Sequence, residues 1–295
     1  MLFRSACLRQ LVANEPATQR RDSEALHQMR IALRRLRAAS SLFSDVVSDD
    51  RVAIIKAELK WLGSEFGPAR DLDSFILEVL KPLRKQQADE PGLISIGKMF
   101  ARERLKSYRR AQDAVQSVRF RKLVIDTAEW IEAGPWNTSE DPLQRARRDL
   151  PIEDHASEQL SRRRKKLRKR GDEIGELGPE QLHKLRIQVK KARYAAEFFS
   201  GLYPRKKALK RREHYLSPLK QLQNSLGGFN DIMTRKTLCA DVIARPRRGL
   251  PAEQNRRRAY AAGLIMGNQK AQIQKLLLSA SEAHAQLTKS KPFWK

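Results

Sequence analysis

Apolar side chains recur every three or four residues along most of the chain, the spacing that places them on one face of an α-helix. Leu26, Met29, Leu33 and Leu36 form one such series, and residues 51–66 carry a second. The alternation of apolar and polar residues that marks β-strands is almost absent. The pattern therefore predicts an all-α protein.

Turn-forming residues set the expected helix boundaries. The Gly-Pro pair at 67–68 is expected to end a helix, and four aspartates stand at positions typical of helix caps, Asp71, Asp73, Asp231 and Asp241. Beyond the helix that begins near residue 26, helices are predicted over residues 51–66, 71–87, 93–117, 119–133, 153–170, 179–202, 205–226, 231–243 and 253–287.

Two segments of the chain occur twice, in the same order. Residues 26–43 (LHQMRIALRRLRAASSLF) match residues 182–199 (LHKLRIQVKKARYAAEFF) at seven of 18 positions, with an offset of 156. Residues 59–72 match residues 219–232 more loosely, with an offset of 160. Two ordered matches at nearly one offset predict an internal duplication.

The stretch at 134–142 (GPWNTSEDP) is rich in turn formers, so we expect the boundary between the two copies there. This predicts a first helical half over residues 1–140 and a second over residues 141–295. Because each half carries the helical pattern, we expect two helical bundles related by a pseudo-twofold axis.

A row of basic side chains runs along each repeated helix, about 100° around the helix axis from the leucines. The row in the first copy, called the first stripe, consists of His27, Arg30, Arg34 and Arg37. The row in the second copy, called the second stripe, consists of His183, Arg186, Lys190 and Arg193. Arg35 borders the first stripe and Lys191 borders the second.

Like charges one turn apart destabilise an isolated helix by roughly 0.2–0.5 kcal/mol per pair. A solvated face is the ordinary explanation of such a charge run, but this run recurs in both copies with histidine at the same position. The recurrence favours a multivalent anion that lies along the helix and accepts charge-assisted hydrogen bonds from it.

The histidine of each stripe admits several roles. No HxxxH or HxxE spacing and no cysteine accompanies it, so metal ligation is not expected. Hydrogen bonding to an anion in the protonated form and a purely structural role both stay open.

Composition limits the class of partner. The chain carries a net charge of +26, and repulsion among its like charges destabilises the folded state. A bound polyanion would neutralise this charge, so nucleic acid, an anionic membrane surface and polyphosphate are the candidate binding partners. No apolar run reaches the roughly 18 residues that a membrane helix needs. Arg4 and Arg9 interrupt any signal sequence, and two cysteines without a CxxC motif fit a reducing cytoplasm.

Motifs for catalysis are missing from the sequence. There is no glycine-rich phosphate loop, no GxSxG motif and no cluster of metal-binding carboxylates. We therefore expect a binding protein that is not an enzyme and that needs neither a cofactor nor a metal.

Two denser basic runs compete with the stripes. Residues 161–170 (SRRRKKLRKR) contain eight basic residues and residues 205–212 (RKKALKRR) contain six. In isolation either could be a nucleic-acid patch. Both fall on predicted helices, so participation in the anion site and simple solvation stay open for them.

The repeated H-x-[ML]-R-I-x-x-[RK]-[RK]-x-R motif, the downstream L-K-x-L followed by G and D, and the duplication resemble the CHAD family, the conserved histidine α-helical domain. The resemblance covers about residues 8–295. It implies two four-helix-type bundles around a basic central groove that binds inorganic polyphosphate, and association with polyphosphate or polyhydroxyalkanoate granules in the cytoplasm. The chain lacks the ExExK signature of the triphosphate-processing domain fused to some members, so the resemblance implies a stand-alone binder.

Carried onto this sequence, the resemblance places both stripes in the groove. Lys60 and Lys220 fall in the second shared motif and are added to the site. The predicted polyphosphate-binding residues are His27, Arg30, Arg34, Arg35, Arg37, Lys60, His183, Arg186, Lys190, Lys191, Arg193 and Lys220. Non-sequence-specific binding of nucleic acid is the alternative function, although only 6% of the residues are aromatic and able to stack on bases.

Overall fold

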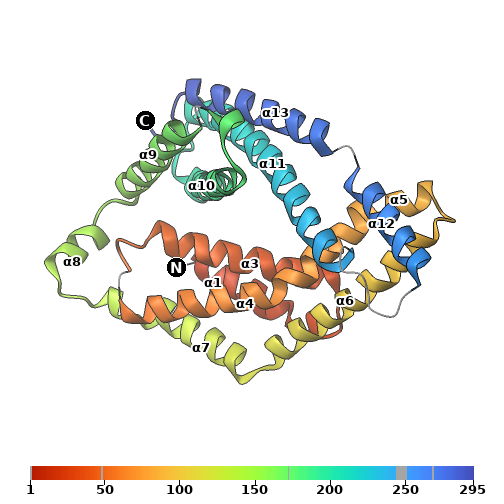
Figure 1. The fold of residues 1–295 in the computed structure, drawn as a ribbon. Coiled ribbons are helices and arrows are strands. Elements are labelled where there is room, and N and C mark those ends of the chain that lie inside the picture. The colour runs from red at the N-terminus through yellow and green to blue at the C-terminus, as the bar shows by residue number, and fades with distance from the viewer. Residues whose placement is uncertain (1, 48, 172, 244–250, 268) are drawn as a thin grey trace. The chain divides into compact units, whose positions relative to one another are not determined.

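The computed structural model describes residues 2–47, 49–171, 173–243, 251–267 and 269–295, and it is helical throughout with no strand in these ranges (Figure 1). The prediction of an all-α protein is confirmed. No helix in these ranges is both long enough and apolar enough to cross a membrane.

The chain folds into two compact units. Unit 1 consists of Met1–Arg148 with Val242–Ile265, and unit 2 consists of Asp149–Asp241 with Met266–Lys295. Packing therefore does not follow chain order, because the segment that contains nearly all of α12 (Ala252–Met266) belongs with the N-terminal part. The sequence division into residues 1–140 and 141–295, and the duplication itself, stay predictions.

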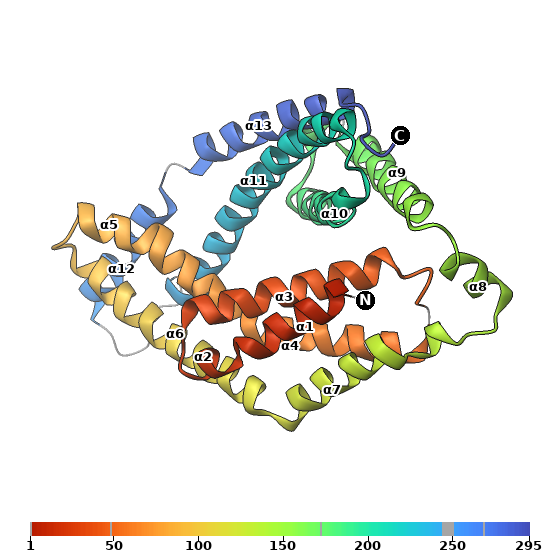
Figure 2. The same cartoon turned by 180° about the vertical axis from the view of Figure 1, so that it is seen from behind.

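Unit 1 is built around long helices that lie side by side, as both views show (Figures 1 and 2). Its helices are α1 (Leu2–Ala13), α2 (Glu15–Gln19), α3 (Ser23–Leu42), α4 (Asp50–Phe75), a π-helical turn η1 (Ile76–Leu80), α5 (Lys81–Gln86), α6 (Pro91–Gln116), α7 (Val118–Ala133), a 3-10 turn η2 (Pro135–Asn137), α8 (Pro142–Arg148) and α12 (Ala252–Met266).

Unit 2 contains fewer helices, and α9 packs against α10. Its helices are α9 (Ile152–Arg170), a 3-10 turn η3 (Ile174–Glu176), α10 (Pro179–Phe198), a 3-10 turn η4 (Ser200–Leu202), α11 (Lys206–Ile243) and α13 (Gln269–Lys289).

The core of unit 1 contains the apolar series that predicted its helices. Leu26, Met29, Leu33 and Leu36 on α3 are each at most 3% exposed and pack in one cluster with α1, α4, α6 and α7. Burial of a leucine side chain stabilises the folded state by about 1.5–3 kcal/mol. The basic stripe on the same helix is thereby held at the edge of a rigid core.

The prediction that residues 67–68 end a helix is wrong, because α4 runs unbroken through Pro68 to Phe75. Phe66, Ala69 and Leu72 stay buried on one face across the proline. Tertiary packing of that face outweighs the one hydrogen bond that the proline cannot donate. Asp71 and Asp73 therefore lie inside a helix and cap nothing.

The same error affects the second copy. Residues 205–226 and 231–243 were expected as two helices, whereas α11 is continuous from Lys206 to Ile243. Leu226, Phe229 and Ile232 are buried across the expected break, so packing again keeps the helix intact. The expected caps at positions 231 and 241 lie within α11.

One break was missed. The helix predicted over residues 253–287 is divided into α12 and α13. Gly267 follows the last residue of α12 with a φ of 47°, a left-handed conformation that glycine adopts without a Cβ clash and that commonly ends helices.

Candidate functional site

The start of α3 is fixed by a side-chain cap. The carboxylate of Asp22 accepts hydrogen bonds from the backbone N–H groups of Glu24 and Ala25, at 2.8 and 2.9 Å. A capping aspartate of this kind contributes about 1 kcal/mol to helix stability. Because the helix begins at Ser23, His27 lies in its second turn and the rest of the first stripe follows it along α3.

The first stripe lies where α3 meets α4. His27, Arg30 and Arg34 are half-buried and Arg37 is exposed. Since the leucines one position earlier are fully buried, these side chains follow the rim of the core rather than project from an open face. The stripe therefore becomes more solvated toward its C-terminal end.

Two glycines on α4 leave room for the arginines of α3. A Cβ built at Gly67 would lie 3.5 Å from Nη1 of Arg30, and one built at Gly63 would lie 3.9 Å from Nη1 of Arg37. These pairings show that α3 and α4 run antiparallel and that the two guanidinium groups reach across to α4. Lys60, which is exposed, precedes Gly63 by three residues and shares its face of α4.

Arg30 is the most enclosed cation of the first stripe. Its side chain is 21% exposed, and Nη2 lies 3.8 Å from Oδ1 of Asp71, longer than a hydrogen bond. Its Nη1 is buried without a hydrogen-bond partner among the described residues. Burial lowers the pKa of the guanidinium, Asp71 opposes that shift, and Arg34 adds to it. Arg30 stays charged, with one donor unused.

His27 contributes a second buried nitrogen that lacks a hydrogen-bond partner among the described residues. Its Nδ1 is buried and makes no hydrogen bond to any described residue. The pKa of His27 is lowered, first because burial disfavours the charged ring and next because Arg70 repels it. In the protein alone the ring is therefore neutral near pH 7, and a nearby anion would favour its protonation.

Arg35 lies toward α1 rather than with the stripe. It is exposed, and its Nη1 is 3.5 Å from Oε1 of Gln10, a long contact. It is also the charge that acts to lower the pKa of the buried Cys7, which burial itself raises to about 11. The structure thus brings His27, Arg30 and Arg34 together and sets Arg35 apart from them.

The second stripe is more strongly paired within its own unit. Nε of Arg193 donates to Oε1 of Glu197 at 2.7 Å, one turn further along α10. Nδ1 of His183 lies 3.0 Å from Oδ1 of Asn230 on α11. Arg186 and Lys190 are half-buried between these two.

The predicted site includes two further residues of unit 2 that are not part of the stripe itself. Lys191 on α10 and Lys220 on α11 are both exposed. Lys184, which borders His183, pairs with Glu180 at 2.6 Å. Acidic residues one turn away therefore accompany the second stripe at both of its ends.

Sequence reasoning missed one interaction of each histidine. Arg70 acts on His27, and Asn230 bonds to His183. Arg70 and Asn230 are equivalent positions under the offset of 160, so each histidine interacts with the same position of the second shared motif. The residue types differ, so sequence identity between the two copies does not reveal them. The offset alone could have found them.

Asp73 was expected as a cap and is instead a buried ion-pair partner. It is 2% exposed, accepts from Nε of Arg104 at 2.5 Å and accepts from the hydroxyl of Tyr108 at 2.5 Å. Burial and the carboxylate raise the pKa of Tyr108 well above its ordinary range. This network joins α4 to α6 and has a structural role.

In each of the two dense basic runs, some side chains contact the rest of unit 2 and others are exposed. In residues 161–170, Arg163 is buried and donates to the backbone oxygen of Gln159 at 3.1 Å, whereas Arg162, Lys166 and Arg170 are exposed. In residues 205–212, Nη1 of Arg212 reaches the backbone oxygen of Ser200 at 3.4 Å, and Lys206 and Lys207 are exposed. Each run thus contributes both to packing and to a solvated surface.

In the described part of the chain, no group of three or more His, Cys, Asp or Glu side chains is placed to hold a metal ion.

Helical units that carry a row of basic side chains at the rim of a core define an all-α protein with a basic helical surface. A family model described as the CHAD domain matches residues 4–240. The chain belongs to the CHAD domain family. No match to a curated protein was found.

Two solved structures share the fold. The CHAD domain from the plant Ricinus communis is 27% identical, with a TM-score of 0.72 over 98% of this chain and 90% of that one. PptA from Streptomyces chartreusis is 18% identical, with a TM-score of 0.67 over 95% of this chain and 96% of that one. The second likeness concerns the fold alone.

Proposed function

We propose that the protein binds inorganic polyphosphate along the first and second stripes and acts as a binding protein, not as an enzyme. The observation that carries the proposal is a pair of buried nitrogen atoms on α3 that have no hydrogen-bond partner among the described residues: Nη1 of Arg30, which is a donor, and Nδ1 of His27, which becomes a donor when the ring is protonated. A buried donor left unpaired costs about 1–3 kcal/mol. A phosphate that accepts from both would remove that cost.

The charge balance of unit 1 supports an anion at this place. Glu58 and Glu65 on α4 accept from Arg119 and Arg110, so cations of α6 and α7 are neutralised on that face. On the face of α4 that meets α3, Asp71 is the acid that the first stripe approaches. Repulsion between Arg30 and Arg34 is thus only partly balanced by the protein itself.

The placement of aromatic side chains supports polyphosphate over nucleic acid. Binding of single strands depends on exposed aromatic rings that stack on bases. Among the side chains that the structure describes, Tyr260 is the one exposed aromatic, and it is carried by α12 and not by either of the helices that bear the stripes. Trp61 is covered by the guanidinium of Arg119, 4.0 Å from the ring centroid. Polyphosphate needs positive charge and no stacking surface.

The proposal extends to location. A protein that binds long polyphosphate chains would gather at polyphosphate granules in the cytoplasm, and association with polyhydroxyalkanoate granules is the variant that the family resemblance adds. The basic central groove that the resemblance implies is part of the same hypothesis.

The test compares the affinities of the protein for polyanions of equal charge. Purified protein is titrated with long-chain polyphosphate and with single-stranded RNA and duplex DNA of matched phosphate number, at about 0.15 M salt. We expect polyphosphate to bind at least tenfold more tightly than either nucleic acid. Equal or tighter binding of nucleic acid contradicts the proposal, and polyphosphate that is shortened during the titration contradicts the absence of enzymatic activity.

A further inference from the structure

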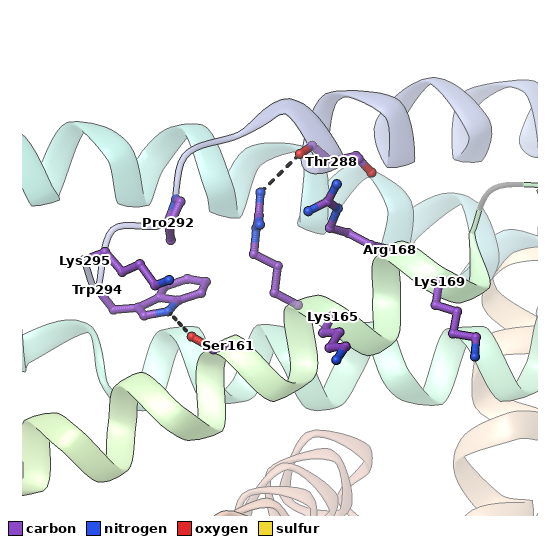
Figure 3. A pocket seen from close by; sticks show the side chains of 9 residues that line it. Ser161, Lys165, Arg168, Lys169, Thr288, Pro292, Trp294 and Lys295 are labelled. Atoms are coloured by element: carbon purple, nitrogen blue, oxygen red, sulfur yellow. Dashed lines mark hydrogen bonds between the residues drawn. The ribbon is translucent and has the colours of Figure 1, made fainter.

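A pocket in unit 2 carries a further concentration of basic side chains. It has a volume of about 580 Å³ and is formed by α9, by Thr288 in the last turn of α13 and by the segment that follows α13. Figure 3 shows Ser161, Lys165, Arg168 and Lys169 along α9, with the segment from Thr288 to Lys295 opposite them. No residue of the second stripe lines it. Its size falls in the range of about 300–1,000 Å³ that is typical of small-molecule sites.

All the charged side chains that line this pocket are basic. Five of its nine residues are cationic and none is acidic: Arg164, Lys165, Arg168, Lys169 and Lys295. A neighbouring pocket of about 500 Å³ shares Lys169 but contains Glu173 as a counter-charge. Among the described residues, no ion pair is recorded for Lys165, Arg168 or Lys169.

The electrostatics agree with an unneutralised cluster. The pKa of Arg164 is lowered, first by burial and then by repulsion from Arg168. Charged groups brought together in a partly desolvated place cost free energy that an anion of matching charge recovers.

The wall of the pocket is held in place by specific contacts. Nη2 of Arg164 donates to the backbone oxygens of Thr288 and Ser290, at 3.1 and 2.7 Å. Nε1 of Trp294 donates to Oγ of Ser161 at 2.9 Å. The pocket therefore has a preorganised shape, and its remaining cations are free to contact a ligand.

We propose that this pocket is a second anion site that binds a compact inorganic oligophosphate of about three phosphates, separately from the stripes. Lys165, Arg168, Lys169 and Lys295 would each donate to phosphate oxygens, and Arg164 would hold the wall against them. The inference does not need the stripes to bind polyphosphate.

The aromatic residue at the pocket favours a free oligophosphate over a nucleotide. Trp294 is 5% exposed, and its ring is packed edge-on against Tyr215 and Phe293, with centroids 5.1 and 4.9 Å away. A ring enclosed in this way offers no open face on which a nucleobase could stack. The phosphate part of the ligand is therefore the recognised part.

The experiment isolates the pocket from the stripes. A stripe variant, Arg30→Ala, Arg37→Ala, Arg186→Ala and Arg193→Ala together, is titrated calorimetrically with sodium tripolyphosphate and with ATP. Into this variant either the pocket pair Lys165→Gln and Arg168→Gln or a control pair is added. The control, Lys81→Gln and Lys85→Gln on α5, removes the same charge from exposed positions that line no part of the pocket.

We expect the stripe variant to bind one tripolyphosphate per chain. The pocket pair should weaken that binding by about tenfold or more, and the control pair by no more than about twofold. Helix content by circular dichroism should be equal in all variants. Equal weakening by both pairs, or no binding by the stripe variant, overturns the inference, and tighter binding of ATP identifies a nucleotide site instead. Undiminished binding of long-chain polyphosphate by the stripe variant would instead contradict the proposed function and leave the pocket standing.

Discussion

The first and second stripes have nearly the same sequence and differ in what surrounds them. In the first, Arg30 is largely enclosed beside α4, its acid partner is 3.8 Å away, and one of its donors is unused. In the second, Arg193 is bonded at 2.7 Å to Glu197 of its own helix. Equal spacing of the cations along two helices therefore does not give two equivalent binding sites. Burial and the nearest acid decide which donors are available to a ligand.

The largest expected effect comes from removing the two stripes separately. Arg30→Ala with Arg34→Ala should weaken polyphosphate binding by at least about 150-fold, because each lost charge-assisted contact costs roughly 1.5–3 kcal/mol. Arg186→Ala with Arg193→Ala should cost about tenfold, since Glu197 already competes for Arg193. Fluorescence anisotropy with labelled polyphosphate measures both. A second-stripe loss equal to or above the first would show that burial is not what distinguishes them.

The next effect is a dependence on pH. The pKa of His27 lies below its ordinary value of 6.5 in the free protein, so the folded state favours the neutral ring, and the stability that this ring contributes is lost as pH falls. Under the proposed function, a phosphate bound beside the ring would raise that pKa again, so binding would take up a proton. Polyphosphate affinity should therefore rise between about pH 7.5 and pH 5.5, by at most about tenfold per pH unit.

The control for this effect is His27→Gln, which keeps a polar side chain and cannot titrate. Its affinity for polyphosphate should depend less steeply on pH than that of the natural sequence. The number of protons taken up on binding, measured calorimetrically in two buffers, should be smaller for the same reason. If both curves have the same slope, His27 does not face the ligand and its role is structural.

The smallest effect should come from making the second stripe resemble the first. Glu197→Gln removes the acid that holds Arg193, and exposed pairs of this kind contribute about 0.2–1 kcal/mol. Polyphosphate affinity should rise by about two- to fivefold, with little change in the thermal midpoint. Glu180→Gln, which releases Lys184 in the same way, serves as the matched substitution next to His183. A fall in affinity would mean that Glu197 positions Arg193 for the ligand.

Much of the fold was predictable because it depends on local spacing. The series Leu26, Met29, Leu33 and Leu36 identified both the helix and its buried face, and burial confirms it. The helix breaks were mispredicted because Gly and Pro are local signals. At Pro68 the apolar face of α4 continues through the proline, and long-range packing outweighs the local cost.

The candidate site was predictable in its residue types but not in its surroundings. The repeat located both stripes, yet it could not show that Asp71 approaches Arg30 or that Arg35 turns toward Gln10. The pocket beside Arg168 was likewise hidden, because its far wall comes from residues 288–295, distant in the sequence from the basic run on α9.

The dependence of polyphosphate affinity on salt tests the central claim most directly. The logarithm of the affinity is measured against the logarithm of salt concentration for the natural sequence and for the variant with Arg30, Arg37, Arg186 and Arg193 all changed to Ala. Each phosphate contact contributes a slope of roughly 0.7–0.9 for nucleic acids, so the variant should be shallower by about 3. An unchanged slope would contradict the account, because the polyphosphate would then be held by cations outside both stripes.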